Sequence, residues 1–413
     1  MILARLMRPA LARAAKAIVH KHRPFVVGIS GSVGKTSAKD AVSCVLREWT
    51  RTVSSPGNQN DELGVPLSII GAGPSGRNPF GWIATLRRAR QILRSRDGSY
   101  PECLVLEFGS CHVGDVEYLM QMSTPDVGVL TGIEATHLEF YGSLEAIERE
   151  EGKVVTMLPA SGVGIVNVDN PGAAAAVARA SCRIVTYGFE AAADVRALGA
   201  VSSIDWDRFT ACTHLEVQCG EERGTLRIDG TLGSHSCYAP LAALGVAQAV
   251  GVPFVDAMRT LRNYVPPPGR MRCGPGLSRS LVIDDTYNSS PAAAMSALQA
   301  LAAVAPRGGS AEAIAVLGPM AELGPISRSQ HEAVGRHAAG LGLDCVVTVG
   351  SAARDTARAA RDAGMPDDRV LELAGTEEAI RALMERGKPG DVVLVKGSRS
   401  AQMERVAQAL TAS

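Results

Sequence analysis

A glycine-rich turn joins an apolar run to a helical pattern near the start of this chain, and its residue types suit phosphate binding. Residues 25–30 are predicted to form a short buried strand, and the helical pattern continues to about residue 47. Small residues let backbone N–H groups approach phosphate oxygens, and a helix N-terminus adds partial positive charge. The turn consists of Gly31, Ser32, Val33, Gly34, Lys35, Thr36 and Ser37.

Two side chains of this turn could act on a nucleotide. Lys35 would reach the β- and γ-phosphates, and the Thr36 hydroxyl would bind a magnesium ion. The match to the phosphate-loop pattern G-x-x-x-x-G-K-[ST] is incomplete, because Ile29 stands at the first glycine position. An ordinary glycine-rich turn is the alternative, but the position between a strand and a helix favours nucleotide binding.

A carboxylate closes another apolar run that is predicted to be a strand. Glu107 ends residues 103–107, and a metal-binding partner of a phosphate loop should lie at the end of a neighbouring strand. A carboxylate so placed can hold magnesium directly or through water. A glutamate at a strand end is by itself more often a solvated or capping residue. The phosphate loop beside it favours the metal site.

Composition limits the class of protein. The 413-residue chain is long enough for two or three domains. Its formal net charge is zero and its pI is about 7.1, which argues against nucleic-acid or membrane binding over the whole surface. The nine cysteines form no C-x-x-C pair, and no run of about 18 apolar residues predicts a spanning helix. We expect a cytoplasmic enzyme with no nucleic-acid partner.

Residues 1–24 carry six basic residues and no acidic residue. Their apolar residues follow the i, i+3, i+4, i+7 spacing of an amphipathic helix, at Leu3, Leu6, Met7, Ala10, Leu11, Ala14 and Ile18. One interpretation is a helix that contacts an anionic lipid surface at the membrane periphery, or a partner subunit. The other is a helix packed on its own domain with its basic face in water.

The remaining pattern predicts two α/β units. Apolar runs at 25–30, 103–108, 127–130 and 164–168 alternate with helical stretches, which is typical of a mostly parallel sheet covered on both faces. Residues 195–230 show short alternating segments that suit an antiparallel extension of this sheet. The Pro-Pro-Pro-Gly run at 266–269 is a stiff linker, and a second alternation follows it at 281–283, 313–317, 345–349 and 392–395.

From about residue 25 to its end, the chain resembles the Mur ligase family. The individual motifs are weak to moderate, but their joint order is specific. They lie at residues 31–37, 57–60, 63–66, 107–110, 137–138, 142–144, 268–270, 284–288, 320–324 and 395–400. The set is most similar to the branch that adds D-alanyl-D-alanine to a muramoyl tripeptide.

The resemblance implies a fold and a reaction. The fold would be α/β, with a phosphate-loop central domain at 25–266 and a Rossmann-like C-terminal domain at 267–413, preceded by the helix of 1–24. The enzyme would use ATP and Mg²⁺ to convert a substrate carboxylate into an acyl phosphate, which the amine of an amino acid or dipeptide then attacks. Closure of the two domains would exclude water.

The resemblance also assigns roles to single residues. Metal ligands would be Thr36, Glu107 and His137, although a histidine held by a structural hydrogen bond is the alternative for His137. Arg270, after the hinge, would meet the γ-phosphate. Residues near the ribose and base would be Asp284, Asp285, Tyr287 and Asn288. Substrate-binding residues would be Asn58, Asn60, Lys396, Ser398 and Arg399.

Three departures from the family pattern stand out. Mur ligases usually carry a lysine that becomes carbamylated and binds a second magnesium, whereas Glu151 stands at that position here. We expect Glu151 to supply the carboxylate directly; the alternatives are Lys153, two residues on, or a merely solvated helix face. Only about 24 residues precede the strand that leads into the phosphate loop, where this branch has a domain for the UDP-sugar. Pro319 and Ser236 replace a usual aspartate and asparagine.

The expected function is therefore amide-bond formation, in its commonest form the transfer of D-Ala-D-Ala to a muramoyl-peptide precursor of the cell wall. A ligase of another pathway, such as polyglutamate, folate-type or natural-product synthesis, remains open. So does a partner subunit that binds nucleotide for another ligase. A plain phosphate-loop NTPase or kinase is disfavoured, since it would not need the motifs of the second domain.

Overall fold

The predicted apolar runs form the central strands of two sheets in the computed structural model, which describes residues 2–305 and 309–411. The first sheet has nine strands in the order β2-β3-β1-β4-β5-β6-β7-β8-β9. These are β1 (Phe25–Ser30), β2 (Thr52–Ser54), β3 (Cys103–Glu107), β4 (Val127–Leu130), β5 (Val163–Asn167), β6 (Arg183–Gly188), β7 (Val195–Asp205), β8 (Thr210–Cys219) and β9 (Glu222–Asp229).

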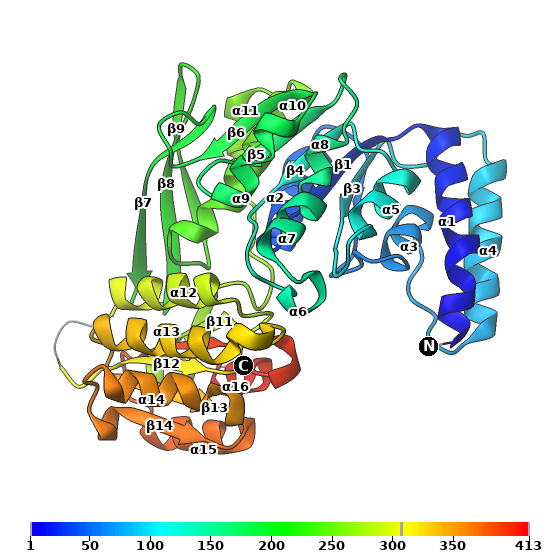
Figure 1. Ribbon diagram of the computed structural model, residues 1–413. Coiled ribbons are helices and arrows are strands. Elements are labelled where there is room, and N and C mark those ends of the chain that lie inside the picture. The colour runs from blue at the N-terminus through cyan, green and yellow to red at the C-terminus, as the bar shows by residue number, and fades with distance from the viewer. Residues whose placement is uncertain (1, 306–308, 412–413) are drawn as a thin grey trace.

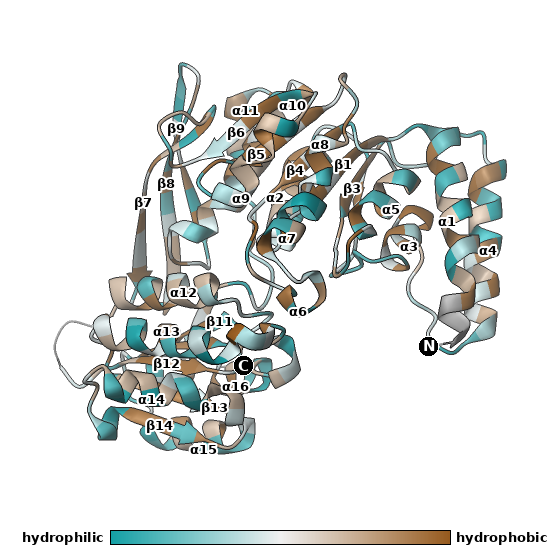
Figure 2. Ribbon diagram, viewed as in Figure 1, coloured by the Kyte–Doolittle hydropathy of each residue, from teal (hydrophilic) through white to brown (hydrophobic). Residues whose placement is uncertain are grey.

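The first sheet is parallel from β2 to β7 and antiparallel from β7 to β9. This confirms both the parallel core and the antiparallel extension predicted for 195–230. Strands buried on both faces have continuous apolar sequences, which is why they could be recognised. Figure 2 shows β1, β3 and β4 as hydrophobic strands between their covering helices.

Helices cover both faces of the first sheet (Figure 1). One face packs against α2 (Lys35–Arg47), α10 (Tyr238–Val250) and α11 (Phe254–Leu261). The other packs against α1 (Ile2–His22), α3 (Gly64–Ile70), α4 (Pro79–Arg94), α5 (Asp115–Met122), α7 (Leu144–Glu151) and α8 (Lys153–Thr156). The short α6 (Leu138–Tyr141) and α9 (Pro171–Ala174) lie in connections. We call this body the central lobe.

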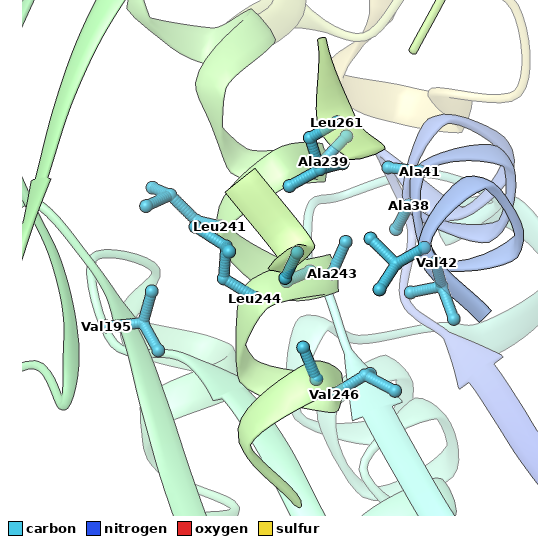
Figure 3. Packing of buried hydrophobic residues seen from close by; sticks show 14 of the residues in the cluster. Ala38, Ala41, Val42, Val195, Ala239, Leu241, Ala243, Leu244, Val246 and Leu261 are labelled. Atoms are coloured by element: carbon cyan, nitrogen blue, oxygen red, sulfur yellow. The ribbon is translucent and has the colours of Figure 1, made fainter. Parts of the chain in front are cut away.

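Small side chains allow α10 to pack closely on α2. Ala38, Ala41 and Val42 of α2 face Ala243 and its neighbours on α10 in Figure 3, and all three α2 residues are at most 1% exposed. Leu241 of α10 is fully buried and turns toward Val195 on β7. The helix that follows the phosphate loop is thereby fixed on the sheet.

The second sheet has six strands in the order β10-β11-β15-β12-β13-β14, all parallel except β10. Its strands are β10 (Arg272–Gly276), β11 (Ser280–Asp285), β12 (Ala313–Leu317), β13 (Cys345–Val349), β14 (Val370–Leu373) and β15 (Val392–Lys396). One face packs on α12 (Pro291–Ala303), α13 (Ser327–Gly340) and α14 (Arg354–Asp362), the other on α15 (Thr376–Arg386) and α16 (Glu404–Leu410). We call this body the C-terminal lobe.

The two sheets exchange no strand, so we propose the same division of the chain at residues 266–267. However, residues of the central lobe also pack into the core of the C-terminal lobe. Ala211 of β8 and Leu232 are buried in the hydrophobic core of the C-terminal lobe, and the Cys273 N–H donates to the Gly230 carbonyl at 2.8 Å. The antiparallel extension therefore serves as a contact between the lobes, in addition to the hinge.

The predicted N-terminal helix is confirmed as α1, which packs on α3, α4 and α5. Leu11, Ala15 and Ile18 are fully buried. Leu6, another apolar residue of the predicted pattern, is 70% exposed near the start of the helix. No helix in the described part of the chain is long and apolar enough to cross a membrane.

Leu241→Ala should lower the free energy of unfolding by about 2–5 kcal/mol, since it leaves a cavity in a fully packed core. Urea unfolding followed by circular dichroism measures this change. Val255→Ala on the adjacent α11, where the side chain is 66% exposed, is the control and should stay within about 0.5 kcal/mol of the wild type. Equal effects of both substitutions would contradict the packing described.

Candidate active site

A cavity of about 1050 Å³ lies where the carboxyl ends of the parallel strands of both lobes meet. Turns after β1, β3, β4 and β5 line it from the central lobe, and turns after β11 and β15 line it from the C-terminal lobe. Crevices outside the carboxyl ends of strands are the usual ligand sites of open α/β sheets. Both lobes therefore contribute to one site.

The phosphate loop is held by its neighbour, the turn after β4. Gly31 has φ of 133°, and a Cβ there would lie 2.2 Å from the Thr131 Oγ1. The Ser32 N–H donates to the Gly132 carbonyl at 2.7 Å, and the Thr131 hydroxyl donates to the Val33 carbonyl at 2.6 Å. Only glycine suits position 31, because a side chain there would displace Thr131 and the turn that holds the loop.

Helix α2 begins directly after the loop, at Lys35. Gly34, with φ of 84°, turns the chain into the helix, so the first backbone N–H groups of α2 face the cavity end of the loop. The Lys35 ammonium lies over the loop and contacts the carbonyl oxygens of Gly31 and Ser32. Positive charge and free N–H groups thus gather where phosphate oxygens would bind.

Glu107 is a buried charged residue of the site, with only 1% of its side chain exposed. Its Oε1 accepts hydrogen bonds from Asn60 at 2.8 Å and from the Thr36 hydroxyl at 3.3 Å. The Lys39 ammonium, also 1% exposed, lies 3.5 Å from Oε2 and donates to the Gly57 carbonyl at 2.5 Å. Lys39 was not singled out from the sequence, since nothing local marks a helix lysine as buried.

The Thr36–Glu107 pair fits a magnesium ion. Glu107 Oε2 is a buried oxygen with no hydrogen-bond partner among the described residues, and the Thr36 hydroxyl lies beside the same carboxylate. A carboxylate and a hydroxyl are hard oxygen ligands of the kind that Mg²⁺ prefers. In the described residues no group of three or more His, Cys, Asp or Glu side chains could hold a metal, so phosphate oxygens and water would have to complete the coordination.

His137 also lines the cavity, but its imidazole faces the other lobe. Its Nδ1 lies 2.5 Å from a carboxylate oxygen of Glu322 in the C-terminal lobe, a close contact without hydrogen-bond geometry. Burial lowers the pKa of His137, while the nearby Glu322 carboxylate opposes that shift. Its assignment as a metal ligand stays a prediction; the observed role is a contact between the lobes.

Glu151 lies directly behind the phosphate loop. Its carboxylate accepts a hydrogen bond from the Ser32 hydroxyl at 2.8 Å, and its side chain is 2% exposed. Burial raises the pKa of Glu151 to about 7, although the Lys35 charge opposes that shift. Lys153, the alternative for this role, instead pairs with Glu150 at 2.9 Å and Glu117 at 3.1 Å. The geometry therefore favours Glu151 over Lys153.

Arg270 connects the hinge to the phosphate loop. Its guanidinium donates to the Thr36 hydroxyl at 3.4 Å and stacks 3.9 Å from the centre of the Tyr287 ring. The Arg399 guanidinium is 5.6 Å from the same ring. The stacking on Tyr287 and the hydrogen bond to Thr36 hold Arg270 close to the place predicted for the γ-phosphate.

The predicted substrate residues of the C-terminal lobe are mostly engaged with each other. Lys396, 2% exposed, donates to Asp285 at 2.6 Å and to the Asn288 carbonyl at 3.0 Å. The Ser398 hydroxyl accepts the Ala321 N–H at 2.8 Å. Both side chains order the turns around them, which leaves Arg399 as the exposed cation of this group.

Most of the residues predicted from the sequence meet in the cavity. Those that line it are Ser32, Gly34, Lys35, Ser37, Asn58, Asn60, Glu107, His137, Arg270, Asp285, Tyr287, Asn288, Lys396, Ser398 and Arg399. Those that do not line it are Gly31, Thr36, Asp284 and Glu151. Asp284 instead accepts the Gly269 N–H at 3.1 Å and fixes the hinge.

Sequence reasoning missed several residues on the cavity wall. Asn167 is the last residue of β5, Asn170 lies in the turn after it, and Tyr238 begins α10. For the two asparagines the signal was a polar residue at or just after the end of a buried strand, similar to the signal that identified Glu107, whereas Tyr238 follows no strand and had no such signal. His235 also lines the cavity; burial lowers its pKa, and its ring contacts the Ser296 hydroxyl at 3.2 Å.

Two family models match this chain: the Mur ligase middle domain over residues 29–247 and the Mur ligase, glutamate ligase domain, over residues 269–399. The UDP-N-acetylmuramoyl-tripeptide–D-alanyl-D-alanine ligase of Mycobacterium tuberculosis H37Rv is 31% identical over 94% of this chain and 73% of its own length. The ligase of the same name from Escherichia coli K12 is 27% identical over 93% of this chain and 76% of its own length.

A solved structure extends the similarity to the fold. The MurF ligase from Thermotoga maritima in complex with ADP has a TM-score of 0.79 and 26% identity, covering 97% of this chain and 83% of that one. The similarity therefore covers both lobes of this chain, and the similar protein was solved in complex with ADP.

Lys39→Met should lower the free energy of unfolding by about 3–5 kcal/mol, because it leaves the buried Glu107 carboxylate without its cation. The double variant Lys39→Met/Glu107→Gln removes both charges and should recover at least about 1 kcal/mol of that loss. Urea unfolding of the wild type, both single variants and the double variant measures the coupling. Strictly additive losses would show that the pair does not interact.

Proposed function

Because this chain belongs to the Mur ligase family, we propose that it is an ATP-dependent ligase that joins a substrate carboxylate to an amine. The observation that carries this proposal is the meeting of Arg270, from beyond the hinge, with Thr36 at the phosphate loop. A nucleotide phosphate placed at the loop would lie between the two lobes. A substrate bound on either side could then react with it.

The proposed reaction has two steps. The substrate carboxylate attacks the γ-phosphorus of ATP, the bond to the β-phosphate oxygen breaks, and ADP leaves with an acyl phosphate formed. The amine then attacks the carbonyl carbon, loses a proton and expels inorganic phosphate, which leaves an amide. Phosphoryl transfer of this kind depends mainly on positioning and on charge neutralisation.

The residues of this chain supply those two requirements. Lys35 and the N-terminus of α2 place positive charge at the loop, and Arg270 adds a guanidinium from the opposite side. Thr36 and Glu107 would hold Mg²⁺, which neutralises phosphate charge when bound. Asn60 and Lys39 keep the Glu107 carboxylate in place.

Contacts between the lobes protect the site from water. His137 meets Glu322, Arg270 meets Thr36, and the antiparallel extension packs into the C-terminal core. An acyl phosphate is prone to hydrolysis, so a site assembled only between closed lobes favours attack by the amine. We assign Arg399 and the turn of Asn58 and Asn60 to the substrates, since all three line the cavity.

The relatives named above support a more specific proposal, in which D-alanyl-D-alanine is the amine and a muramoyl tripeptide is the acceptor. We also propose a cytoplasmic location. All nine cysteines lie in the described residues and none is in a disulfide, as expected in a reducing compartment.

Phosphate release with Mg-ATP tests the function directly. Purified protein is given amino acids or D-Ala-D-Ala together with UDP-linked or lipid-linked muramoyl peptides, and products are identified by mass. We expect release to need both the dipeptide and a muramoyl peptide, and to fall at least about 100-fold in Lys35→Met. Release with another amine and acceptor would assign the ligase to another pathway. Release that needs no amine would contradict the ligase itself.

Glu151 should lose a proton when Mg-nucleotide binds, if its carboxylate becomes a metal ligand in place of a carbamylated lysine. Its pKa of about 7 means that proton release should be largest below pH 7 and disappear well above it. Calorimetry in buffers of different ionisation enthalpy measures the release. Glu151→Gln should abolish it, and Glu134→Gln is the matched control, since burial raises the pKa of Glu134 to about 7 as well.

The same raised pKa has a consequence for stability. Glu151 stabilises the fold fully below its unfolded pKa of 4.5, and this contribution is lost as the pH rises toward 7. Glu151→Gln should therefore gain stability relative to the wild type over that interval.

Full ligase activity in Glu151→Ala, or a requirement for bicarbonate in the wild type, would contradict the proposed role of Glu151 as a metal ligand in place of a carbamylated lysine.

A further inference from the structure

Basic charge is concentrated in two segments of this otherwise neutral chain. Residues 2–23 and 63–96 contain twelve of the 42 Lys and Arg residues and none of the 42 Asp and Glu residues. The rest of the chain, with 30 basic and 42 acidic residues, therefore has a formal net charge of −12. Such an asymmetry orients a protein in the field of a charged partner.

The fold brings the two segments together. Helices α1 and α4 pack side by side and run in the same direction, at the edge of the central lobe (Figure 1). Their ends are joined by Lys21, which donates to the carbonyl oxygens of Ile92 at 3.3 Å and Leu93 at 2.8 Å. The two helices therefore form one surface, which we call the α1–α4 surface.

Most basic side chains of this surface have no acidic partner. Arg8 pairs with Glu62, and Arg88 donates to the Ile70 carbonyl at 2.8 Å. Others are exposed and make no ion pair with any described residue; they are Arg13, Lys16, Arg23, Arg77, Arg87, Arg90, Arg94 and Arg96. Helical spacing places Arg13 and Lys16 on the outer face of α1, and Arg87, Arg90 and Arg94 on that of α4.

Exposed apolar side chains lie on the same outer faces, toward the N-terminal ends of both helices. Leu6 of α1 is 70% exposed, and Phe80 and Ile83 of α4 are 78% and 45% exposed. Leu6 is seven residues before Arg13, and Phe80 seven before Arg87, so each pair shares one helix face. An apolar end beside a basic face is the composition of helices that lie in a membrane interface.

We propose that the α1–α4 surface docks this protein on an anionic lipid bilayer. The exposed arginines and lysines would lie against lipid headgroups, and Phe80, Leu6 and Ile83 would enter the boundary between headgroups and acyl chains. The remaining chain, with its net negative charge, would be repelled and so would face away. This defines a single orientation of the protein on the surface.

The charge and the apolar residues together favour lipid over other anionic partners. A nucleic acid would be bound by the basic side chains alone and would leave the aliphatic Leu6 and Ile83 in water. A protein partner would need acidic residues opposite a long double row of arginines. A bilayer with anionic lipids matches both properties over an extended, flat contact.

The docking surface adjoins the cavity, because Arg8 of α1 and its partner Glu62 both line the cavity wall. A ligase docked in this way would have its site next to the bilayer. This consequence rests on the proposed function, and it suggests an acceptor that carries a lipid. The docking itself does not depend on the ligase reaction.

Co-sedimentation with vesicles tests the proposal on the full chain. The probes are vesicles of phosphatidylcholine alone and of phosphatidylcholine with phosphatidylglycerol. We expect binding only to the anionic vesicles, weakened by salt. The quadruple variant Arg13→Glu, Lys16→Glu, Arg87→Glu, Arg90→Glu should bind at least about 100-fold more weakly.

The matched control reverses four exposed arginines elsewhere, in Arg208→Glu, Arg223→Glu, Arg369→Glu, Arg381→Glu. It has the same net charge as the test variant and should retain most of the binding. The apolar contribution is tested by Phe80→Ser, which should reduce binding several-fold at high salt, against Val201→Ser, which is 69% exposed on β7. Thermal unfolding and ADP binding should be unchanged in all variants, which separates docking from folding and from the nucleotide site.

Four outcomes would overturn the proposal. The wild type could fail to bind anionic vesicles, or bind neutral vesicles equally well. The control variant could lose as much binding as the test variant. Finally, a single-stranded oligonucleotide could compete at a lower concentration than the vesicles, which would assign the surface to nucleic acid. If the wild type binds anionic vesicles but has no ligase activity, the proposed function is contradicted and the docking proposal stands.

Discussion

The buried Glu107 carboxylate is the constraint on which the rest of the site depends. A charge that is 1% exposed is stable only with partners, and here they come from two places: Thr36 and Lys39 on α2, and Asn60 in a loop of the same lobe. Removing Lys39 would leave Thr36 and Asn60 around an uncompensated charge. The requirement therefore ties strand, helix and loop into one unit.

The second constraint is that the chemistry needs both lobes. The central lobe holds the phosphate loop and Glu107, while Arg270 and Tyr287 come from beyond the hinge. The contacts that cross the boundary include the Arg270–Thr36 hydrogen bond, the His137–Glu322 and His235–Ser296 contacts, the Cys273–Gly230 backbone hydrogen bond and the packing of Ala211 and Leu232. Separate contacts of this kind, between lobes joined by a hinge, suit a site that closes around its substrates.

The structure gives a physical reason for the departure from the family pattern at Glu151. Glu151 is buried against Ser32 of the phosphate loop, while Lys153 is held by two carboxylates away from it. We propose that a glutamate there provides directly the negative group that a carbamylated lysine would provide. In the same way α1 is a packed helix of the central lobe, and its basic face continues onto α4.

The sequence by itself determined the features that depend on neighbours along the chain. Buried runs predicted β1, β4, β12 and β13 with their observed bounds, and the glycines of the phosphate loop marked its turn. Tertiary structure alone decided the pairing of Lys39 with Glu107, of His137 with Glu322 and of α1 with α4, and it left Leu6 exposed. Hydrogen-bonded strands and turns follow local rules, whereas a charge finds its partner, and a helix face its cover, among residues that only folding brings together.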